Sequence, residues 1–341
     1  MTEFWFWSPI MLGQGMKEDD TSDIRATIEQ FYTPAPYSEL VQDGEVLIAG
    51  VGGIGCLWAL EAHSRCSNLA ELLLIDADET SFEGANEANC LFLDSGGEGR
   101  GAAALPSMAI HRLRNGADSI SELLERAEVL ILMAGLGGGM GSGASGELAK
   151  MANQYGCMVL SVAGLPFAEQ PLRYAIAEEA LPSLEANSSV CIRVSMERLA
   201  WQSKRRKTDW ITGSGWIEEL VEGLVTTLAR VGRINLDLMD MRAIINKEGN
   251  ATLIVGTGSS ESPNSVVEMA RNSPLNDVSI DGAKGCMIQV EGGPDMTLSH
   301  LTELTDSFVS SMDPDCQVIM GARVSDEMVG KLRLVAIVSG I

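Results

Sequence analysis

Two glycine-rich turns constrain the fold of this chain more than any other feature of its sequence. The first is GVGGIG at 50–55 and the second is GLGGGMGSG at 135–143; each follows an apolar run and precedes a helix-forming run. A glycine in ordered structure costs roughly 0.5–1 kcal/mol relative to alanine, so these clusters indicate a need for bare backbone. A strand, a glycine turn and a helix in this order bring backbone amides to a helix N-terminus, where phosphate oxygens bind.

The apolar runs around these turns predict a parallel sheet. Strands are expected in 45–64 before the first turn, at 70–78, at the end of 122–135, in 157–167 and at 189–196, with helices after the first turn, at the start of 122–135 and at 145–156. Strands that alternate with helices indicate the α/β class and a doubly wound parallel sheet. Apolar residues at helical spacing over 215–232 predict a long connecting helix.

The pattern changes after the connecting helix. Strands are expected at 251–259, 285–293, 316–324 and 332–341, around helices at 263–273 and 298–312. This pattern predicts a second, smaller α+β domain. The resulting division of the chain is an N-terminal extension at 1–44, a nucleotide-binding domain at 45–209, a central helix with an acidic loop at 210–242, and a C-terminal domain at 243–341.

Composition excludes several classes of function. The net charge is −23, with 47 acidic and 24 basic residues, so nucleic acid and anionic membranes are poor partners. The sequence contains no run of 18 apolar residues, so no membrane span is predicted. The N-terminus lacks the basic region of a signal peptide. Seven cysteines without a CxxC pair and three histidines support neither a disulfide scaffold nor a zinc site, and no metal ligands are assigned. A reducing cytoplasm fits this composition, and the basic stretch 203–207 is expected to be a solvated loop or helix end.

The first turn alone leaves several nucleotide sites open. GVGGIG fits G-x-G-x-x-G, and Asp76 ends the next strand where a ribose-binding acid would lie in a dinucleotide enzyme. The same region resembles the adenylating enzymes that activate ubiquitin-like proteins. No G-x-x-x-x-G-K-[ST] is present and no lysine lies near the turns. Amides, helix dipoles and a bound cation must therefore supply the positive charge for phosphate.

Three stretches together resemble one family. GLGGGMGSGASGELAKMA is similar to the glycine-rich signature of the tubulin/FtsZ superfamily, with Met140 and Ser142 where threonines are usual. GRINLDLMDMRAII at 232–245 resembles the co-catalytic loop of FtsZ, and 273–298 resembles the FtsZ C-terminal domain. The resemblance runs from Glu45 to Ile341 and leaves the first 44 residues unaccounted for.

The resemblance implies a fold and an activity. It implies a GTPase domain with a doubly wound parallel sheet, a central connecting helix and a smaller α+β domain, in subunits that stack head to tail into protofilaments. GTP is hydrolysed where the acidic loop of one subunit, with Asn235, Asp237, Asp240 and Arg242, meets the nucleotide of the next; the first three are the catalytic candidates. The implied cofactors are GTP or GDP with Mg²⁺ or a monovalent cation. The implied partners are the chain itself and a membrane adaptor or other division proteins, in the cytoplasm at the division site.

The family's nucleotide contacts map onto specific positions. Asp78 matches the acid of the N-T-D loop, Gly99 and Gly101 fall in the third phosphate loop, and Glu169 and Arg173 match contacts to ribose and phosphates. The remaining predicted contacts are Gly52, Gly53, Ile54, Gly55, Gly137, Gly138, Gly139, Met140, Gly141, Ser142, Gly143, Met196 and Trp210.

Three positions depart from the family pattern. Leu57, Met196 and Gly215 stand where side chains read guanine in the family, so the chain resembles a divergent archaeal or bacterial member. Unmet hydrogen bonds are what reject wrong bases, so guanine specificity is in question. A non-hydrolysing scaffold with altered base specificity is the alternative. The chain ends at the domain's last strand without the usual C-terminal tail, so a tether would use another surface, such as the aromatic N-terminus at 5–7.

Overall fold

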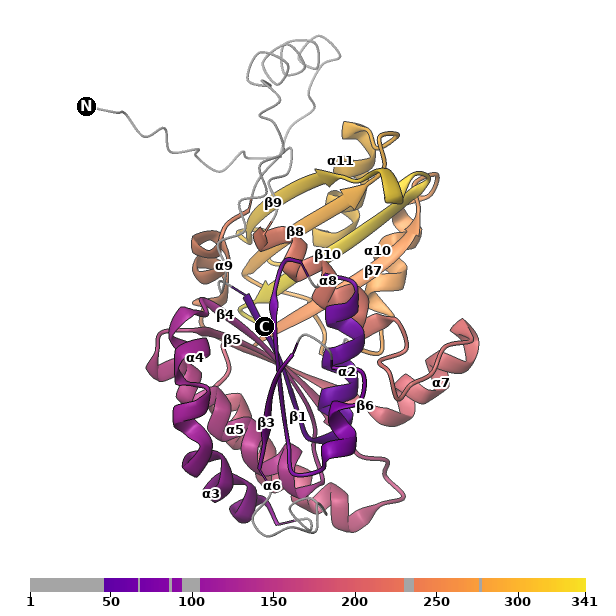
Figure 1. Ribbon diagram of the computed structural model, residues 1–341. Coiled ribbons are helices and arrows are strands. Elements are labelled where there is room, and N and C mark those ends of the chain that lie inside the picture. The colour runs from indigo at the N-terminus through magenta and orange to yellow at the C-terminus, as the bar shows by residue number, and fades with distance from the viewer. Residues whose placement is uncertain (1–45, 67, 86–87, 94–104, 230–235, 276–277) are drawn as a thin grey trace, which may run out of the picture. The chain divides into compact units, whose positions relative to one another are not determined.

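The computed structural model describes residues 46–341, except 67, 86–87, 94–104, 230–235 and 276–277. Three of the predicted site residues, Gly99, Gly101 and Asn235, lie outside the described residues, as does the N-terminal extension at 1–44. Element labels below are those of Figure 1.

The N-terminal half is built on a parallel sheet whose strands, in the described chain, lie in the order β3-β2-β1-β4-β5-β6. Its strands are β1 Val46–Val51, β2 Glu71–Asp76, β3 Asn89–Phe92, β4 Val129–Gly135, β5 Met158–Leu165 and β6 Val190–Ser195. Every neighbouring pair is parallel. The order reverses between β1 and β4, so the predicted doubly wound sheet is confirmed.

Helices cover both faces of this sheet (Figure 1). On one face, Val46 and Ile48 of β1 share a core with α2 Gly52–Ser64 and α8 Trp216–Ala229. On the other face, Leu47 and Ala49 share a core with α3 Pro106–Gly116, α4 Ser121–Arg126, α5 Gly139–Gln154 and α6 Pro171–Ala186. Alternate residues of one strand thus face opposite cores, as the pleat of a strand requires. Short helices η1 Glu79–Phe82 and η2 Ala117–Ser119 and the helix α7 Met196–Arg206 complete this half.

The C-terminal half contains a mixed sheet of order β7-β10-β8-β9. Its elements are α9 Leu238–Ile245, β7 Ala251–Ser259, α10 Pro263–Arg271, β8 Gly285–Gly292, α11 Leu298–Val309, β9 Gln317–Val324, η3 Asp326–Met328 and β10 Lys331–Ser339. Strand β10 is antiparallel to both neighbours, and β8 is parallel to β9. Helices α10 and α11 pack on one face over Ile254, Ile288 and Leu334, while Val255, Met287 and Val335 face the core that contains α8. The predicted smaller α+β unit is confirmed.

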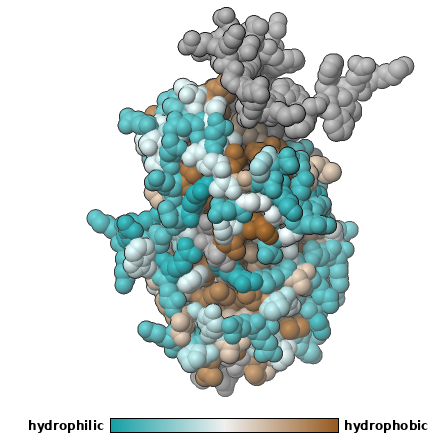
Figure 2. Space-filling model, turned by 180° about the vertical axis from the view of Figure 1, so that it is seen from behind, coloured by the Kyte–Doolittle hydropathy of each residue, from teal (hydrophilic) through white to brown (hydrophobic). Residues whose placement is uncertain are grey.

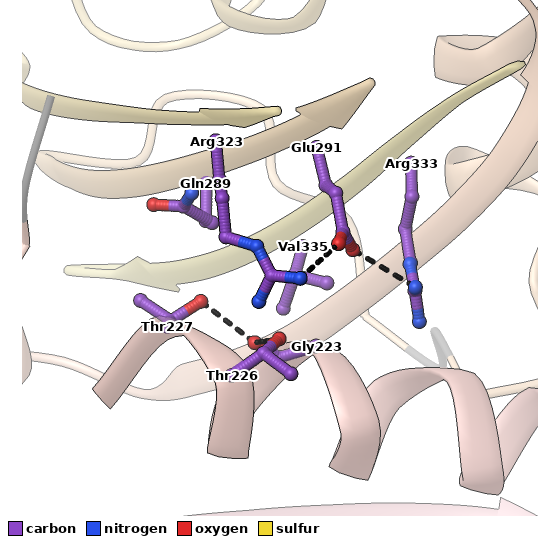
Figure 3. Close-up of a pocket in the computed structure, with 8 residues that line it drawn as sticks. All are labelled: Gly223, Thr226, Thr227, Gln289, Glu291, Arg323, Arg333 and Val335. Carbon is purple, nitrogen blue, oxygen red and sulfur yellow. Dashed lines mark hydrogen bonds and ion pairs between the residues drawn. The ribbon is translucent and has the colours of Figure 1, made fainter. Parts of the chain in front are cut away.

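A buried ionic cluster joins α8 to this second sheet. We define it as Glu222 of α8, Glu291 of β8, Arg323 of β9 and Arg333 of β10. Figure 3 shows Glu291 between the two arginines, with α8 across a small cavity from them. Arg333 pairs with Glu222 and Glu291 at 2.8 Å, and Arg323 pairs with Glu291 at 2.9 Å.

The ion pairs decide the charge state inside this cluster. Burial alone disfavours the charged form of Arg333, but its bonds to Glu222 and Glu291 outweigh burial and raise the pKa of Arg333 above its ordinary value. Within the described residues, Glu222 and Glu291 therefore pair with an Arg333 guanidinium group that stays charged. The cluster fixes one arrangement of α8 against the C-terminal sheet.

The surface agrees with the acidic composition. On the face shown in Figure 2, hydrophilic residues cover most of the surface, and hydrophobic residues show in small areas between them. Among the described residues, no helix is both long enough and apolar enough to cross a bilayer. The basic stretch 203–207 forms the last turn and C-cap of α7, which is the helix end that the sequence allowed.

Candidate functional site

The two glycine turns lie together at the point where the strand order reverses. The first ends β1 and begins α2, and the second ends β4 and begins α5. A Cβ placed on Gly52 would lie 3.0 Å from the backbone nitrogen of Gly141, and a Cβ on Gly135 would lie 2.9 Å from the Cβ of Ile54. The turns are thus in contact, and the N-termini of α2 and α5 open at the same edge of the sheet. This is the edge at which open α/β sheets bind ligands.

Close packing explains part of the glycine content. A Cβ on Gly141 would overlap the carbonyl oxygen of Gly135, and a Cβ on Gly143 would overlap that of Pro106 at the start of α3. Gly138 differs, because a Cβ there would meet nothing within 4 Å. Some glycines in the second turn therefore let helix and strand approach each other, and others leave the backbone open to the pocket.

A pocket of about 480 Å³ opens at these turns, within the range of nucleotide and other small-molecule sites. Eleven of the predicted contacts line it: Gly52, Gly53, Ile54, Asp78, Gly138, Gly139, Met140, Gly141, Arg173, Met196 and Trp210. It is also lined by Asp76, Ser81, Gly135, Leu136, Pro166, Phe167 and Gln170, which were not predicted as contacts of the GTP site.

Five predicted contacts do not line this pocket. Gly55, Gly137 and Gly143 lie in the turns but behind its lining. The Ser142 hydroxyl points into its own turn, where it accepts a 2.8 Å hydrogen bond from the backbone N–H of Gly137. Glu169 is exposed, and the next residue, Gln170, reaches the pocket instead.

Two carboxylates line one side of the pocket. Asp76, at the end of β2, is 4% exposed, and its oxygens accept bonds from Ser81 Oγ at 2.5 Å and from the backbone N–H of Ala77 at 2.7 Å. Burial raises the pKa of Asp76, although these two hydrogen bonds oppose the shift. Asp78 caps η1 by accepting from the backbone N–H of Thr80 at 3.0 Å. Among described residues, no group of three or more acidic, histidine or cysteine side chains is placed to hold a metal.

The acidic stretch predicted as a loop forms the start of helix α9. Asp237 accepts a hydrogen bond from the Asp240 backbone N–H at 2.9 Å, and Asp240 accepts one from the Asp237 N–H at 3.1 Å. This is a capping box, in which each residue satisfies the other's backbone donor. Asp237 is exposed, Asp240 is half-buried, and Met239 between them is 70% exposed. The segment is rigid at its base and open to solvent at its surface.

Helix α5 separates the acidic segment from the pocket of the same chain. The helix begins at the second glycine turn, has 16 residues and ends at Gln154. Just beyond it, the carbonyl oxygen of Gly156 accepts a 3.3 Å hydrogen bond from Arg242 of α9. A 16-residue helix is about 24 Å long. Asp237 and Asp240 therefore lie at the opposite edge of the sheet from the pocket.

These features define a class of protein: an α/β protein with a nucleotide-sized pocket formed by two glycine turns at a topological switch point, without a P-loop lysine. Comparison with known proteins identifies the family. Residues 45–202 match the GTPase domain of the Tubulin/FtsZ family, and residues 249–341 match the FtsZ family C-terminal domain.

Individual relatives agree with this match. The chain is 31% identical to cell division protein FtsZ 2 of Halobacterium salinarum over 311 residues, which cover 88% of this chain and 77% of that one. It is 31% identical to FtsZ 1 of Archaeoglobus fulgidus over 307 residues, covering 87% and 82%. In fold it is similar to an FtsZ dimer from M. jannaschii, with a TM-score of 0.77 at 24% identity over 95% of this chain and 93% of that one.

The chain belongs to the FtsZ family and is a guanine nucleotide-binding GTPase of that family. The resemblance inferred from the three sequence stretches is thus confirmed. The dinucleotide-enzyme and adenylating-enzyme alternatives, which used only the first turn and Asp76, are set aside.

Proposed function

We propose that this chain is a cytoskeletal GTPase of cell division, which polymerises head to tail into protofilaments and hydrolyses GTP where two subunits meet. One observation carries the proposal. The pocket and the acidic start of α9 lie at opposite ends of α5, about 24 Å apart along its axis. Carboxylates at that distance cannot act on a nucleotide held by their own chain. A stacked second copy brings them to it, through a contact that repeats without closing.

The pocket suits phosphoryl transfer. Such reactions need position and charge more than covalent help. The amides at the starts of α2 and α5, together with Arg173, would bind the phosphates, because helix N-termini and guanidinium groups attract anions. The bond that is broken is the one between the β- and γ-phosphates of GTP, and water takes up the γ-phosphoryl group.

The neighbouring subunit would supply the groups that act on water. Asp237 and Asp240 of that subunit can orient a water molecule and polarise it for attack. Their capping box holds both carboxylates in a fixed relation to the start of α9. Asn235 remains a proposed third member of this set.

Several finer assignments belong to the same proposal. A Mg²⁺ or monovalent cation would accompany the phosphates, and Asp78 is the pocket carboxylate best placed to share it. The chain divides at 44, 209 and 242, as the sequence analysis proposes. It acts in the cytoplasm at the division site, with a membrane adaptor or other division proteins as partners.

The decisive test uses Asp240→Asn, which keeps an oxygen for the capping bond and removes the charge. We expect GTP turnover to fall by about 10²–10⁴-fold, the usual contribution of a positioned acid or base. Phosphate release and light scattering would be measured together against protein concentration. Asp306→Asn, an exposed acid on α11, is the matched control and should behave as wild type.

A mixing experiment tests whether the site is shared. Arg173→Ala impairs only the pocket and Asp240→Asn only the acidic end, so a mixed filament regains some complete sites. With random 1:1 mixing, about a quarter of the interfaces combine two intact halves. Recovery of turnover in the mixture supports the proposal. Assembly of the wild-type protein without any turnover would instead support the non-hydrolysing scaffold.

A further inference from the structure

The pocket changes character from one end to the other, following the strand order. Asp76 and Asp78 follow β2, the glycine turns follow β1 and β4, Phe167 follows β5, and Met196 follows β6. Because neighbouring strands are parallel, this order along the sheet is also the order in space. The described lining therefore runs from carboxylates, through backbone amides, to apolar and aromatic side chains.

The amides in the middle fix how a nucleotide must lie. Phosphates bound there have carboxylates on one side and the apolar end on the other. A purine ring favours aromatic and apolar contact, so the base belongs at the end formed by Phe167, Met196 and Trp210.

The apolar end is closely packed. The rings of Phe167 and Trp210 meet edge to face, with centroids 5.2 Å apart and planes at 86°. Met196 is 5% exposed, and the Trp58 ring, which is fully buried, packs beside it: a Cβ on Gly164 would lie 2.5 Å from Met196 Cε and 2.6 Å from Trp58 Cη2. Side chains thus fill the space below the base position.

A buried carboxylate eight residues after Trp210 does not line this end. Glu218, in the first turn of α8, is 3% exposed and is not part of the described lining. Its Oε2 lies under the turn at Gly213, where a Cβ would come within 2.8 Å of it. That turn covers Glu218, while Trp210, three residues earlier, lines the pocket. Guanine's N1–H and amino donors therefore find no carboxylate among the described residues that line this end. Glu197, next to Met196, is exposed and accepts a hydrogen bond from the backbone N–H of Ala168.

Among the lining residues, the polar side chain closest in sequence to this end is Gln170, three residues after Phe167. An amide both donates and accepts hydrogen bonds, so it can pair with either purine. Leu57, on the helix that follows the first turn, is 37% exposed and offers no hydrogen bond.

We infer that this pocket holds the base by stacking and apolar contact, with Trp210 and Met196 as the specificity-determining residues, and accepts adenine as well as guanine nucleotides. The inference rests on the proposed nucleotide-binding role of the pocket. Apolar pockets separate similar ligands by about 10–200-fold, whereas sites built from hydrogen bonds reach 10⁴–10⁵-fold. The GDP-to-ADP affinity ratio should accordingly lie within about 200-fold.

The test is competition of unlabelled GDP, ADP and UDP against a fluorescent guanine nucleotide on the full chain. We expect GDP and ADP to compete within that ratio, and UDP to compete less well because a pyrimidine stacks over less area. A GDP preference above about 200-fold overturns the inference but leaves the proposed function intact. Failure of every nucleotide to bind overturns the proposed function as well.

Variants locate the effect. Trp210→Ala should weaken the binding of GDP and ADP together by about 5–160-fold, since stacking on an aromatic side chain contributes about 1–3 kcal/mol per base. Trp210→Phe should retain most of the affinity that Trp210→Ala loses. Trp201→Ala removes a tryptophan that is 59% exposed on α7, outside the pocket, and serves as the control. A Trp210→Ala protein that lost GDP affinity but kept ADP affinity would contradict the stacking model.

Discussion

The glycine turns and the ionic cluster solve the problem of charge in opposite ways. At the turns, glycine residues leave the backbone without side chains, and the N-termini of two helices face a pocket. In the ionic cluster, two glutamates and two arginines form ion pairs with one another, between α8 and the C-terminal sheet. The charges of the ionic cluster are paired within the chain, so their role is structural. The backbone N–H donors at the glycine turns face the pocket, so their role is to bind a ligand. The comparison predicts that mutations will affect stability at one region and binding at the other.

The largest expected effect is on stability, from Arg333→Met in the ionic cluster. Removing this side chain leaves Glu222 and Glu291 short of a partner, and breaking a buried ion pair from one side costs about 3–5 kcal/mol. Chemical denaturation would measure the free energy of unfolding. Arg114→Met breaks an exposed pair with Glu147, in which the arginine side chain is 57% exposed, and should change little because exposed pairs contribute little. Equal effects of the two variants would falsify the structural role of the cluster.

A smaller effect is expected within the second glycine turn. Gly141→Ala forces its Cβ against the carbonyl oxygen of Gly135, and overpacking of this kind costs about 1–3 kcal/mol. It also shifts the start of α5, so nucleotide affinity should fall with stability. Gly138→Ala is the matched variant, because its Cβ meets no neighbouring atom; its stability should hold while nucleotide binding weakens. Calorimetry with and without GDP would separate the two outcomes.

The smallest effect is expected from Asp76→Asn, which tests the acidic side of the pocket. Burial raises the pKa of Asp76 in the folded protein, so stability contributed by its protonated form is present below the unfolded pKa and is lost as pH rises through the folded pKa. The variant should therefore gain stability relative to wild type as pH rises from 4 to 8. It should also bind GDP up to about tenfold more tightly, since a carboxylate near phosphate is repulsive.

Denaturation curves at several pH values, each with a binding titration, test both parts of this prediction. A variant that loses stability relative to wild type with rising pH would show that Asp76 is stabilised in its charged form.

Much of the fold could be predicted from sequence, because the central strands are long apolar runs ended by glycine turns. Strand β3 was not predicted, because its four residues lie at the sheet edge and are mostly exposed. Helix α6 contains Pro182 and α9 is only eight residues long, so neither carries a clear helical period. The family resemblance predicts a loop at the start of α9, although Asp237 followed three residues later by Asp240 is a helix-capping pattern.

The pocket was predictable only in part, for a similar reason. Glycine turns can be located in the sequence from their composition, and most of their residues line the pocket. Gln170 and Ser81 reach the pocket through the path of loops, which no periodicity encodes. The inward turn of the Ser142 hydroxyl depends on where the Gly137 amide points, and that is a property of the folded turn.

Helix α5 sets a length as well as a direction. Because it begins at the pocket and ends beside α9, its 16 residues fix the spacing and the relative rotation of the two half-sites that each subunit offers to its neighbours. One inserted residue would lengthen the helix by about 1.5 Å and turn everything beyond it by about 100°. If copies stack head to tail as proposed, the axial repeat of the filament would change with it, so the number of residues in this one helix would set that repeat.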